Sequence, residues 1–291
     1  MAFDKTLLET LSEDEGKSVR RLVEKGINIP PQPRVLDELV QQLACGVSDI
    51  RVLRRIIAQD PGIVAMLFKV VESPAYRTHQ PFESIEHILQ AIGIQQTANF
   101  VRAISLSSAL PAKHNRKAFE AFWSRSQAIS QLAMLIADER VMVCNIFPDQ
   151  AALAGIFHDC GVPVLMQRFS TYCKSMQLDE PGCWTNLREE DERFNADHCV
   201  VGYLVGRHWK LPDFICDAIR FHHDITRLDY HAARTMVAIL QLAIHGYHQV
   251  QRVVNPEWEE IGPAVLDELG LDAEGLSEFM DIILERYHRV L

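Results

Sequence analysis

Histidines and one aspartate are the residues of this sequence that are best suited to chemistry. His158 and Asp159 are adjacent at the end of the apolar run AALAGIF, His198 follows in the run DHCVVG, and His222 and His223 close a third apolar segment. Neutral imidazoles and carboxylates suit zinc, iron or nickel, so the set could form an N/O site for a transition metal. Neighbouring helical residues point about 100° apart, so the adjacent pair can share one ion only where other ligands surround it.

Each of these groups also has an ordinary structural explanation. The pair after AALAGIF could hydrogen-bond across a helical bundle, with Arg125 pairing with the carboxylate, because paired buried polar groups cost little. His198 could begin a helix that Asp197 caps. The last two histidines could lie at a helix C-terminus, where the helix dipole favours imidazolium. The spacing alone therefore leaves a metal site and a structural role open.

The elements that must position these residues are helices, because apolar residues recur at three- and four-residue steps nearly throughout the chain. Convincing β alternation is absent from the sequence. Up to about residue 110 the pattern predicts short helices on tight turns, with helix starts at Pro33, Ser48, Asp60 and Ser84. From Phe119 onward, longer helical patterns cover roughly 119–138, 148–159, 161–174, 195–209, 212–223 and 229–250.

Polar stretches divide these helices. The run PAKHNRK at 111–117 predicts a linker between an N-terminal helical layer and a second bundle. A loop rich in Asp and Glu is expected near 178–192, and its run REEDER, at 188–193, is interpreted as a solvated loop or helix face. The first 25 residues predict one charged helix.

Bulk properties limit the classes of partner. The chain has 291 residues and a formal net charge of −10, which argues against chain-wide attraction to nucleic acid or anionic lipid. We find neither a signal-peptide core nor an apolar run of about 18 residues, so we expect a cytoplasmic protein without a membrane segment. Seven cysteines without a CxxC pair fit a reducing compartment. Cys160 and Cys199 lie beside histidines and are the candidates for a functional thiol.

Longer motifs carry a family resemblance. The N-terminal part contains IPPQPRVLDELV, IIAQDPGIVAMLFKVVESPAY and SIEHILQAIG, and the second part contains FWSRSQAIS, LAGIFHDCGVPVL, DHCVVG and LPDFICDAIRFHHD. With these motifs the chain resembles the HD superfamily of metal-dependent phosphohydrolases and, more closely, the HDOD family, a degenerate branch found in bacterial signalling proteins. The resemblance implies an all-α fold, in which an N-terminal helical layer precedes a multi-helix HD-like bundle. It covers most of residues 26–228, with the layer at 26–112, the bundle at 118–228 and a helical extension at 229–291.

Compared with active relatives, the implied catalytic site is incomplete. Arg125, in the run WSR, stands where those enzymes place their first metal-binding histidine. Its permanent charge repels a metal ion while offering Asp159 a bidentate partner. Ile244, in the run LAI, stands where the superfamily carries a closing aspartate. The lysine usual after the HD-x-G turn is also absent, because Val162 follows that turn.

We therefore expect a non-catalytic signal-transduction or regulatory module on a degenerate phosphohydrolase scaffold. It would act in trans through signalling proteins or a small effector, with no nucleic-acid or membrane partner; a homodimer is left open. The alternatives are a metal-dependent phosphohydrolase of nucleotides or cyclic dinucleotides, and a sensor that holds a metal or nucleotide without turnover. No catalytic residue is assigned and no cofactor is expected, although a residual divalent or transition metal is left open. The vestigial pocket would consist of Arg125, His158, Asp159, His198, His222, His223 and Ile244, of which the four histidines and the aspartate are the candidate metal ligands.

Overall fold

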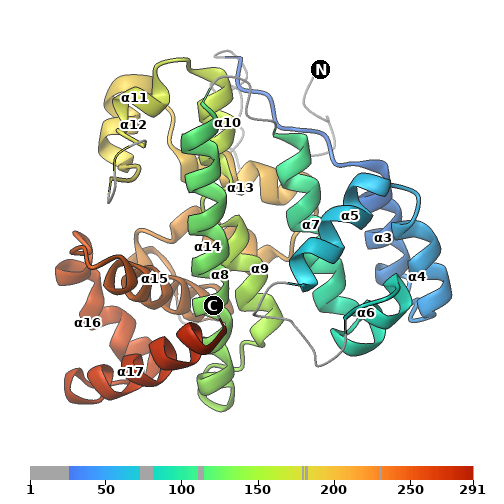
Figure 1. The fold of residues 1–291 in the computed structure, drawn as a ribbon. Helices are drawn as coiled ribbons and strands as arrows, with labels where there is room; N and C mark the ends of the chain where they lie inside the picture. Colours follow the sequence, from blue (N-terminus) through green and yellow to red (C-terminus); the bar gives the residue numbers. More distant parts are fainter. Residues whose placement is uncertain are drawn as a thin grey trace. The chain divides into compact units, whose positions relative to one another are not determined.

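The computed structural model describes residues 26–72, 81–110, 115–178, 180, 183–229 and 231–290. Every regular element in this part of the chain is a helix, which confirms the all-α fold class (Figure 1). The chain divides into two compact units, a smaller one built on residues 31–111 and a larger one built on residues 112–285. The helix expected over residues 1–25 and most of the expected linker lie outside the described residues.

The smaller unit consists of short helices around an aliphatic core. In chain order they are α3 (Arg34–Ala44), α4 (Ile50–Ile57), α5 (Pro61–Val71), α6 (Ile85–Ala91) and α7 (Ile94–Ala109). Helix α7 packs against α3, α5 and α6, and α4 packs against α3 and α6. Leu36, Leu53, Leu67, Ile88 and Val101 are completely buried. Each of the five helices thus contributes one of these residues to the core.

Two of the expected helix caps are confirmed. The carboxylate of Asp60 accepts hydrogen bonds from the backbone nitrogens of Gly62 at 2.8 Å and Ile63 at 3.1 Å. The hydroxyl of Ser84 accepts one from the backbone nitrogen of His87 at 3.0 Å. In both cases a side-chain oxygen pairs with a donor that has no partner within its helix.

The start of α4 corrects the expectation that Ser48 caps it. The cap is Asp49, whose carboxylate accepts from the backbone nitrogen of Arg51 at 2.9 Å. Both side chains are suitable caps, and the sequence does not distinguish them because they are adjacent. Gly46, with a φ of 76°, follows the end of α3, where glycine readily adopts a left-handed conformation.

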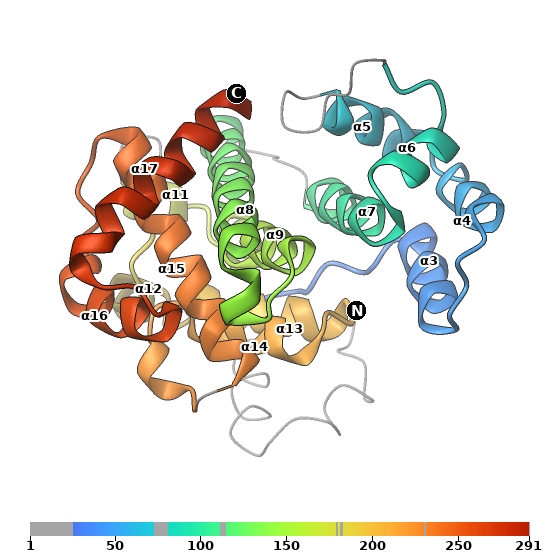
Figure 2. The ribbon, with the colours of Figure 1, turned by 90° about the horizontal axis from the view of Figure 1, so that it is seen from below.

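The larger unit is organised around one long central helix. Its elements are α8 (Arg116–Cys144), α9 (Pro148–Phe157), α10 (Gly161–Arg168), α11 (Tyr172–Ser175), α12 (Leu187–Phe194), α13 (His198–His208), α14 (Asp213–Phe221), a 3₁₀ turn at Ile225–Arg227, α15 (Ala232–Gln251), α16 (Trp258–Leu269) and α17 (Ala273–Val290). The last turn of α17 is grouped with the smaller compact unit. Helices α9 and α15 pack along α8 (Figure 2). Helix α13 packs against α10 and α14, and α16 packs against α15.

Two of the expected elements differ from those observed. The single helix predicted over 161–174 is broken into α10 and α11, because Phe169 takes an extended conformation between them. The stretch expected to be a loop contains α12, which begins after Asn186. The side chain of Asn186 accepts a hydrogen bond from the backbone nitrogen of Glu189 at 3.2 Å.

Among the described residues, no helix combines the length and apolar composition needed to cross a bilayer.

Glycines allow close approaches around the central helices. A Cβ atom at Gly155 would lie 2.5 Å from Cα of Ser130, so α9 lies directly against the backbone of α8. A Cβ atom at Gly161 would lie 2.1 Å from the carbonyl oxygen of His198. The first turn of α10 therefore touches the first turn of α13.

We expect Gly161→Ala to lower the free energy of unfolding by about 1–3 kcal/mol, because the new methyl group would meet backbone atoms that have no room to shift. Urea unfolding followed by circular dichroism measures the change. Gly275→Ala is the matched control: the atom nearest a Cβ there is a carboxylate oxygen of Asp272 at 3.0 Å, and that side chain can move. Equal stability of the two variants would contradict the close approach.

Candidate functional site

Helix ends position the predicted histidines. His158 is the C-cap of α9, and Asp159 lies in the short connection before α10. His198 is the first residue of α13, and the carboxylate of Asp197 caps that helix by accepting from a backbone nitrogen at 2.7 Å. His222 is the C-cap of α14. The helix-terminal positions expected from the sequence are thus confirmed.

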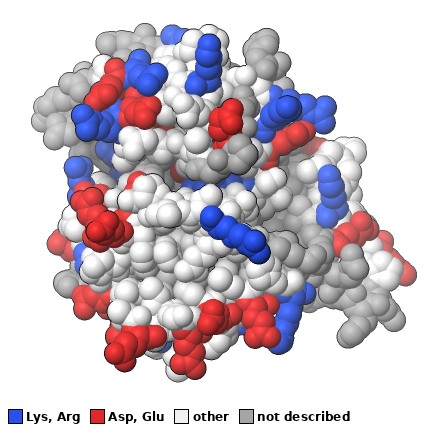
Figure 3. All heavy atoms as spheres, turned by 60° about the vertical axis from the view of Figure 1, so that its left-hand side comes forward, with Lys and Arg blue, Asp and Glu red and all other residues white. Residues whose placement is uncertain are grey.

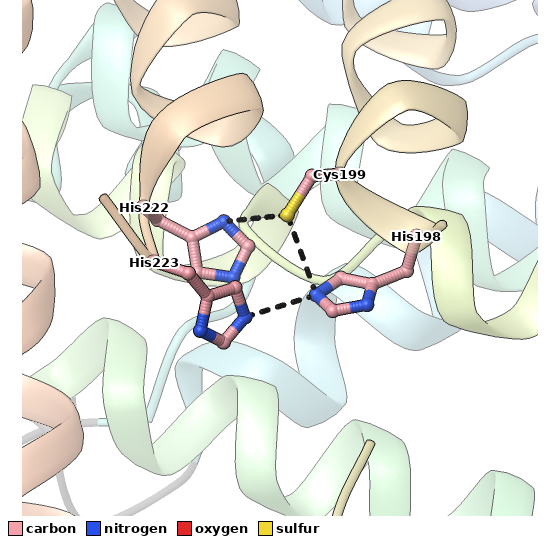
Figure 4. Close-up of side chains that lie close together, drawn as sticks. All are labelled: His198, Cys199, His222 and His223. Carbon is pink, nitrogen blue, oxygen red and sulfur yellow. Dashed lines mark hydrogen bonds between the residues drawn. The ribbon is translucent and has the colours of Figure 1, made fainter. Parts of the chain in front are cut away.

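The structure brings these side chains together around one carboxylate. Oδ2 of Asp159 lies 3.0 Å from Nε2 of His158. Oδ1 lies 3.3 Å from Nε2 of His198 and 3.3 Å from Nε2 of His222. Nε2 of His223 lies 3.1 Å from Nε2 of His198 (Figure 4). Asp159 is 2% exposed, and His158, His198 and His222 are completely buried.

The outer ring nitrogens of two histidines are held by backbone oxygens. Nδ1 of His158 lies 2.6 Å from the carbonyl oxygen of Gly155, and Nδ1 of His222 lies 2.9 Å from that of Ile219. A carbonyl oxygen can only accept, so both Nδ1 atoms carry the proton. In the neutral ring the lone pair is then on Nε2, which faces Asp159.

The other two histidines are held by carboxylates. Nδ1 of His198 lies 2.8 Å from Oε2 of Glu190 on α12, and Nδ1 of His223 lies 2.7 Å from Oε1 of Glu257, just before α16. These contacts also direct the Nε2 lone pairs inward. Metal-binding histidines usually donate their second ring N–H to a carbonyl or carboxylate in this way.

The inward-facing groups attract positive charge. Four Nε2 lone pairs and the carboxylate of Asp159 repel one another unless a proton or a metal ion lies between them. Burial opposes the charge of His222, but the Cys199 thiolate and Asp159 outweigh it and raise the pKa of His222 to about 10. Burial and neighbouring His222 lower the pKa of His223 to about 4. In the absence of a metal, His222 therefore carries the extra proton at neutral pH, whereas His223 is neutral.

The donor atoms fit a transition metal. One donor atom each from His198, Cys199, His222 and His223 lies within 4.8 Å of the others. The sulfur of Cys199 is 3.5 Å from Nε2 of His198. Zinc bonds of about 2.0–2.3 Å in a tetrahedron separate neighbouring ligands by about 3.3–3.6 Å, a spacing that the Cys199–His198 pair already has and that pairs up to 4.8 Å apart would reach only by closing around an ion. Nitrogen and sulfur donors favour zinc and related ions over magnesium. Cys160, the other candidate for a functional thiol, is less suited to bind a metal, because burial raises the pKa of its thiol well above the ordinary value and so disfavours the thiolate.

Arg125 lies in the pocket and forms the expected ion pair with Asp159, but the pairing is not the bidentate one that was expected. Nε of Arg125 is 3.8 Å from Oδ2, whereas Nε1 of Trp184 donates a hydrogen bond to that oxygen at 2.7 Å. The guanidinium lies 4.6 Å from the centre of the Trp184 ring and 5.1 Å from that of Tyr247. Stacking between these two rings keeps the guanidinium from making the two parallel hydrogen bonds of a bidentate arginine–carboxylate pair.

Ile244 is buried on α15, and its aliphatic side chain offers no ligand atom. Its backbone oxygen accepts a hydrogen bond from Nδ1 of His248 at 2.7 Å. Two other residues of α15 reach the pocket: the side-chain nitrogen of Gln241 donates to the carbonyl oxygen of His222, and the ring of Tyr247 lies against Arg125. An aliphatic residue and an amide thus occupy the part of α15 where the family resemblance places the closing aspartate of active relatives.

Glu190 is the main site residue that sequence reasoning missed. The interpretation of REEDER as a solvated run is wrong for Glu190, which is completely buried. Its carboxylate accepts from the backbone nitrogen of His198 at 2.9 Å and from the hydroxyl of Tyr172. Glu192, in the same run, instead pairs with Arg188 on the exposed face. The signal available in the sequence was Asn186, which can cap a helix through the run.

With this geometry established, the comparison with known families decides the identity. The sequence pattern of the HDOD domain matches residues 29–225. The chain belongs to the HDOD domain family. This match confirms the resemblance inferred from the motifs.

Solved structures have the same fold as this HDOD protein. An HDOD domain protein of unknown function from Geobacter sulfurreducens is 22% identical, with 96% of this chain and 97% of that chain covered and a TM-score of 0.68. A protein from Marinobacter aquaeolei VT8, provisionally named a signal transduction protein, is 19% identical, with 100% and 68% covered and a TM-score of 0.70. A third, from Shewanella amazonensis SB2B and provisionally named a metal-dependent phosphohydrolase, is 17% identical, with 98% of each chain covered and a TM-score of 0.68. At these identities the likeness shows the fold alone.

A curated relative is also similar to the HDOD protein. It is an uncharacterised protein of Treponema pallidum (strain Nichols), 20% identical over 206 residues. The match covers 68% of this chain but only 38% of that protein.

Proposed function

We propose that this HDOD protein is a non-catalytic signal-transduction module that acts through protein partners or a small effector. The observation that carries the proposal is the environment of Oδ2 of Asp159, to which Trp184 donates at 2.7 Å and beside which Arg125 lies at 3.8 Å. Hydrolysis by a bound metal needs an open position where a water molecule ionises. An indole and a guanidinium fill that side of the carboxylate, which argues against such a position.

The proposal includes a transition-metal ion retained as a structural element. Its ligands would come from His158, Asp159, His198, Cys199, His222 and His223. When bound, such an ion supplies a cross-link between helix ends and a Lewis acid. The inward lone pairs support this part of the proposal, as do the outer N–H groups held by Glu190 and Glu257.

Proteins are the proposed macromolecular partners. On the face in Figure 3, the described Lys and Arg side chains are dispersed, and Asp and Glu side chains line the lower edge. Nucleic-acid sites gather basic residues to neutralise phosphates. The dispersed pattern, with the net charge of −10, favours a protein partner.

The second candidate function is a metal-dependent phosphohydrolase of a nucleotide or cyclic dinucleotide. The retained cluster of histidines and Asp159 is the observation that favours it. One similar structure carries a provisional name of this kind. It would require other side chains to replace the ligands that are absent at Arg125 and Ile244.

Elemental analysis and a phosphodiesterase assay with added Mn²⁺ distinguish the two candidates. We expect bound transition metal in the wild type, loss of that metal in the double variant His158→Ala, Asp159→Ala, and no turnover by either protein. The expected loss follows from removing two donors of the cluster. Turnover by the wild type that the double variant lacks would establish the phosphohydrolase instead.

A further inference from the structure

The sulfur of Cys199 faces the histidine cluster from the second position of α13. It lies 3.5 Å from Nε2 of His198 and 3.7 Å from Nδ1 of His222 (Figure 4). Nε2 of His198 in turn lies 3.1 Å from Nε2 of His223. The side chain of Cys199 is only 1% exposed. The immediate surroundings of this buried sulfur therefore include ring nitrogens, which bind the same transition metals as a thiolate does.

Two other buried cysteines are placed differently. The thiol of Cys160 donates to the carbonyl oxygen of Gly202 at 3.5 Å, and the thiol of Cys216 donates to that of Leu211 at 3.6 Å. A backbone acceptor of this kind satisfies a thiol without any metal. Cys199 has imidazole nitrogens at these distances instead, so it is the thiol of the three that a metal site would use.

Nε2 of His222 gives a second indication of an ion beside Cys199. This atom is buried and makes no hydrogen bond to the residues that the structure describes. Nδ1 of the same ring is held by the carbonyl oxygen of Ile219 at 2.9 Å, so it is Nε2 that faces the cluster. Its neighbour at 3.3 Å is Oδ1 of Asp159, which can only accept. A bound ion would satisfy both atoms without a hydrogen bond between them.

We propose that Cys199 binds the retained ion through Sγ, beside the histidine donors of the cluster, and so selects Zn²⁺ over Mn²⁺ and Mg²⁺. The ligand set that the family resemblance implies contains histidines and an aspartate but no sulfur. Thiolates favour zinc, whereas oxygen ligands suit magnesium and manganese. The thiol proton is released to solvent as the metal–sulfur bond forms.

A sulfur ligand also bears on catalysis. Catalytic zinc sites keep three protein ligands and leave the next position to water, whereas structural sites fill it with a protein donor. Cys199 would take such a position. The inference rests on the proposed function and deepens it, because it names the residue that selects the ion.

Replacement of the ion by Co²⁺ in the full chain tests the sulfur ligand. Co²⁺ bound by a thiolate shows a sulfur-to-cobalt charge-transfer band in the near ultraviolet, which nitrogen and oxygen ligands alone do not give. We expect the band in the wild type and its loss in Cys199→Ser that circular dichroism shows to be folded. Cys216→Ser is the matched control, because it exchanges another buried thiol that donates to a carbonyl oxygen, and the band should remain.

Competition with a chelator measures the selectivity. We expect Cys199→Ser to weaken Zn²⁺ binding at least about tenfold, since even a change to an outer partner of a metal ligand costs about that much. The affinity for Mn²⁺ should fall far less, because this ion gains little from a thiolate. Equal losses for the two ions would contradict selection by sulfur.

X-ray absorption of the zinc-loaded wild type needs no variant, so it serves if Cys199→Ser does not fold. We expect a sulfur atom at about 2.3 Å from zinc, beside nitrogen atoms at about 2.0–2.1 Å. A shell of nitrogen and oxygen alone would overturn the proposal.

The failure of this inference differs from a failure of the proposed function. If zinc binds without sulfur in its shell, the Cys199 ligand is wrong, while the retained ion and the non-catalytic module stand. If neither Zn²⁺ nor Co²⁺ binds, the ligand and the retained ion are both wrong, and the phosphodiesterase assay alone decides the module. If sulfur is bound and the wild type also hydrolyses a phosphodiester, the ligand stands and the non-catalytic function is wrong.

Discussion

Replacing Glu190 with alanine is expected to lower the free energy of unfolding by about 3–5 kcal/mol, the usual cost of removing one member of a buried charged pair. The Glu190 carboxylate holds the hydroxyl of Tyr172 and both the backbone nitrogen and Nδ1 of His198. Alanine would leave these donors without their acceptor inside the protein, where an unpaired polar group is costly. Urea unfolding at pH 7 measures the loss.

Glu192→Ala is the control, because Glu192 lies on the exposed side of the same helix and pairs with exposed Arg188. Its replacement should change stability little. Burial opposes the charge of Glu190, but His198 outweighs it and lowers the pKa of the Glu190 carboxyl. The carboxylate therefore stabilises the fold fully above the pKa of the unfolded chain, about 4.3, and this contribution is lost as the pH falls through the folded-state value. An equal gap between wild type and Glu190→Ala at pH 7 and in acid would contradict an ionised Glu190.

Arg125→Met is expected to raise the affinity for a transition metal at least tenfold. Arg125 is 7% exposed, and its charge lies 3.8 Å from an oxygen of Asp159, a proposed ligand. A cation so close to the site repels a second one, and the repulsion is only partly screened where water is excluded. Methionine keeps a comparable flexible stem without the charge.

Competition with a chromogenic chelator for Zn²⁺ measures this affinity. Arg116→Met removes the same charge from the exposed start of α8, where Arg116 pairs with Glu120, and should leave the affinity unchanged. Weaker binding by Arg125→Met would mean that the guanidinium serves chiefly to hold Asp159 in place.

Local features of the fold could be predicted because few residues decide them. The caps at Asp60, Ser84 and Asp197 each depend on a side chain and a backbone nitrogen two or three residues away. The helical period of the apolar residues likewise predicted most of the helices. The start of α4 was missed by one residue because two good caps stand next to each other there.

Contacts between distant residues could not be predicted in the same way. Glu190 looks like its solvated neighbours in composition, and only the packing of α12 makes it the partner of His198. Trp184 stands in an irregular connection, where no period indicates which way a side chain points. The ion pair between Arg125 and Asp159 was predicted, but its expected bidentate geometry ignored the aromatic rings that hold the guanidinium.

The contacts of α15 and of the residue before α16 bear on how this protein can be recombined with its relatives. The segment that matches the family ends at residue 225, whereas Glu257 orients His223 and Tyr247 stacks on Arg125. A chimaera that exchanged 29–225 alone would receive the relative's residues at positions 125 and 223 without the residues at 247 and 257 that contact them. Junctions for such exchanges therefore belong after α16, so that the donor's pocket and its supports move together.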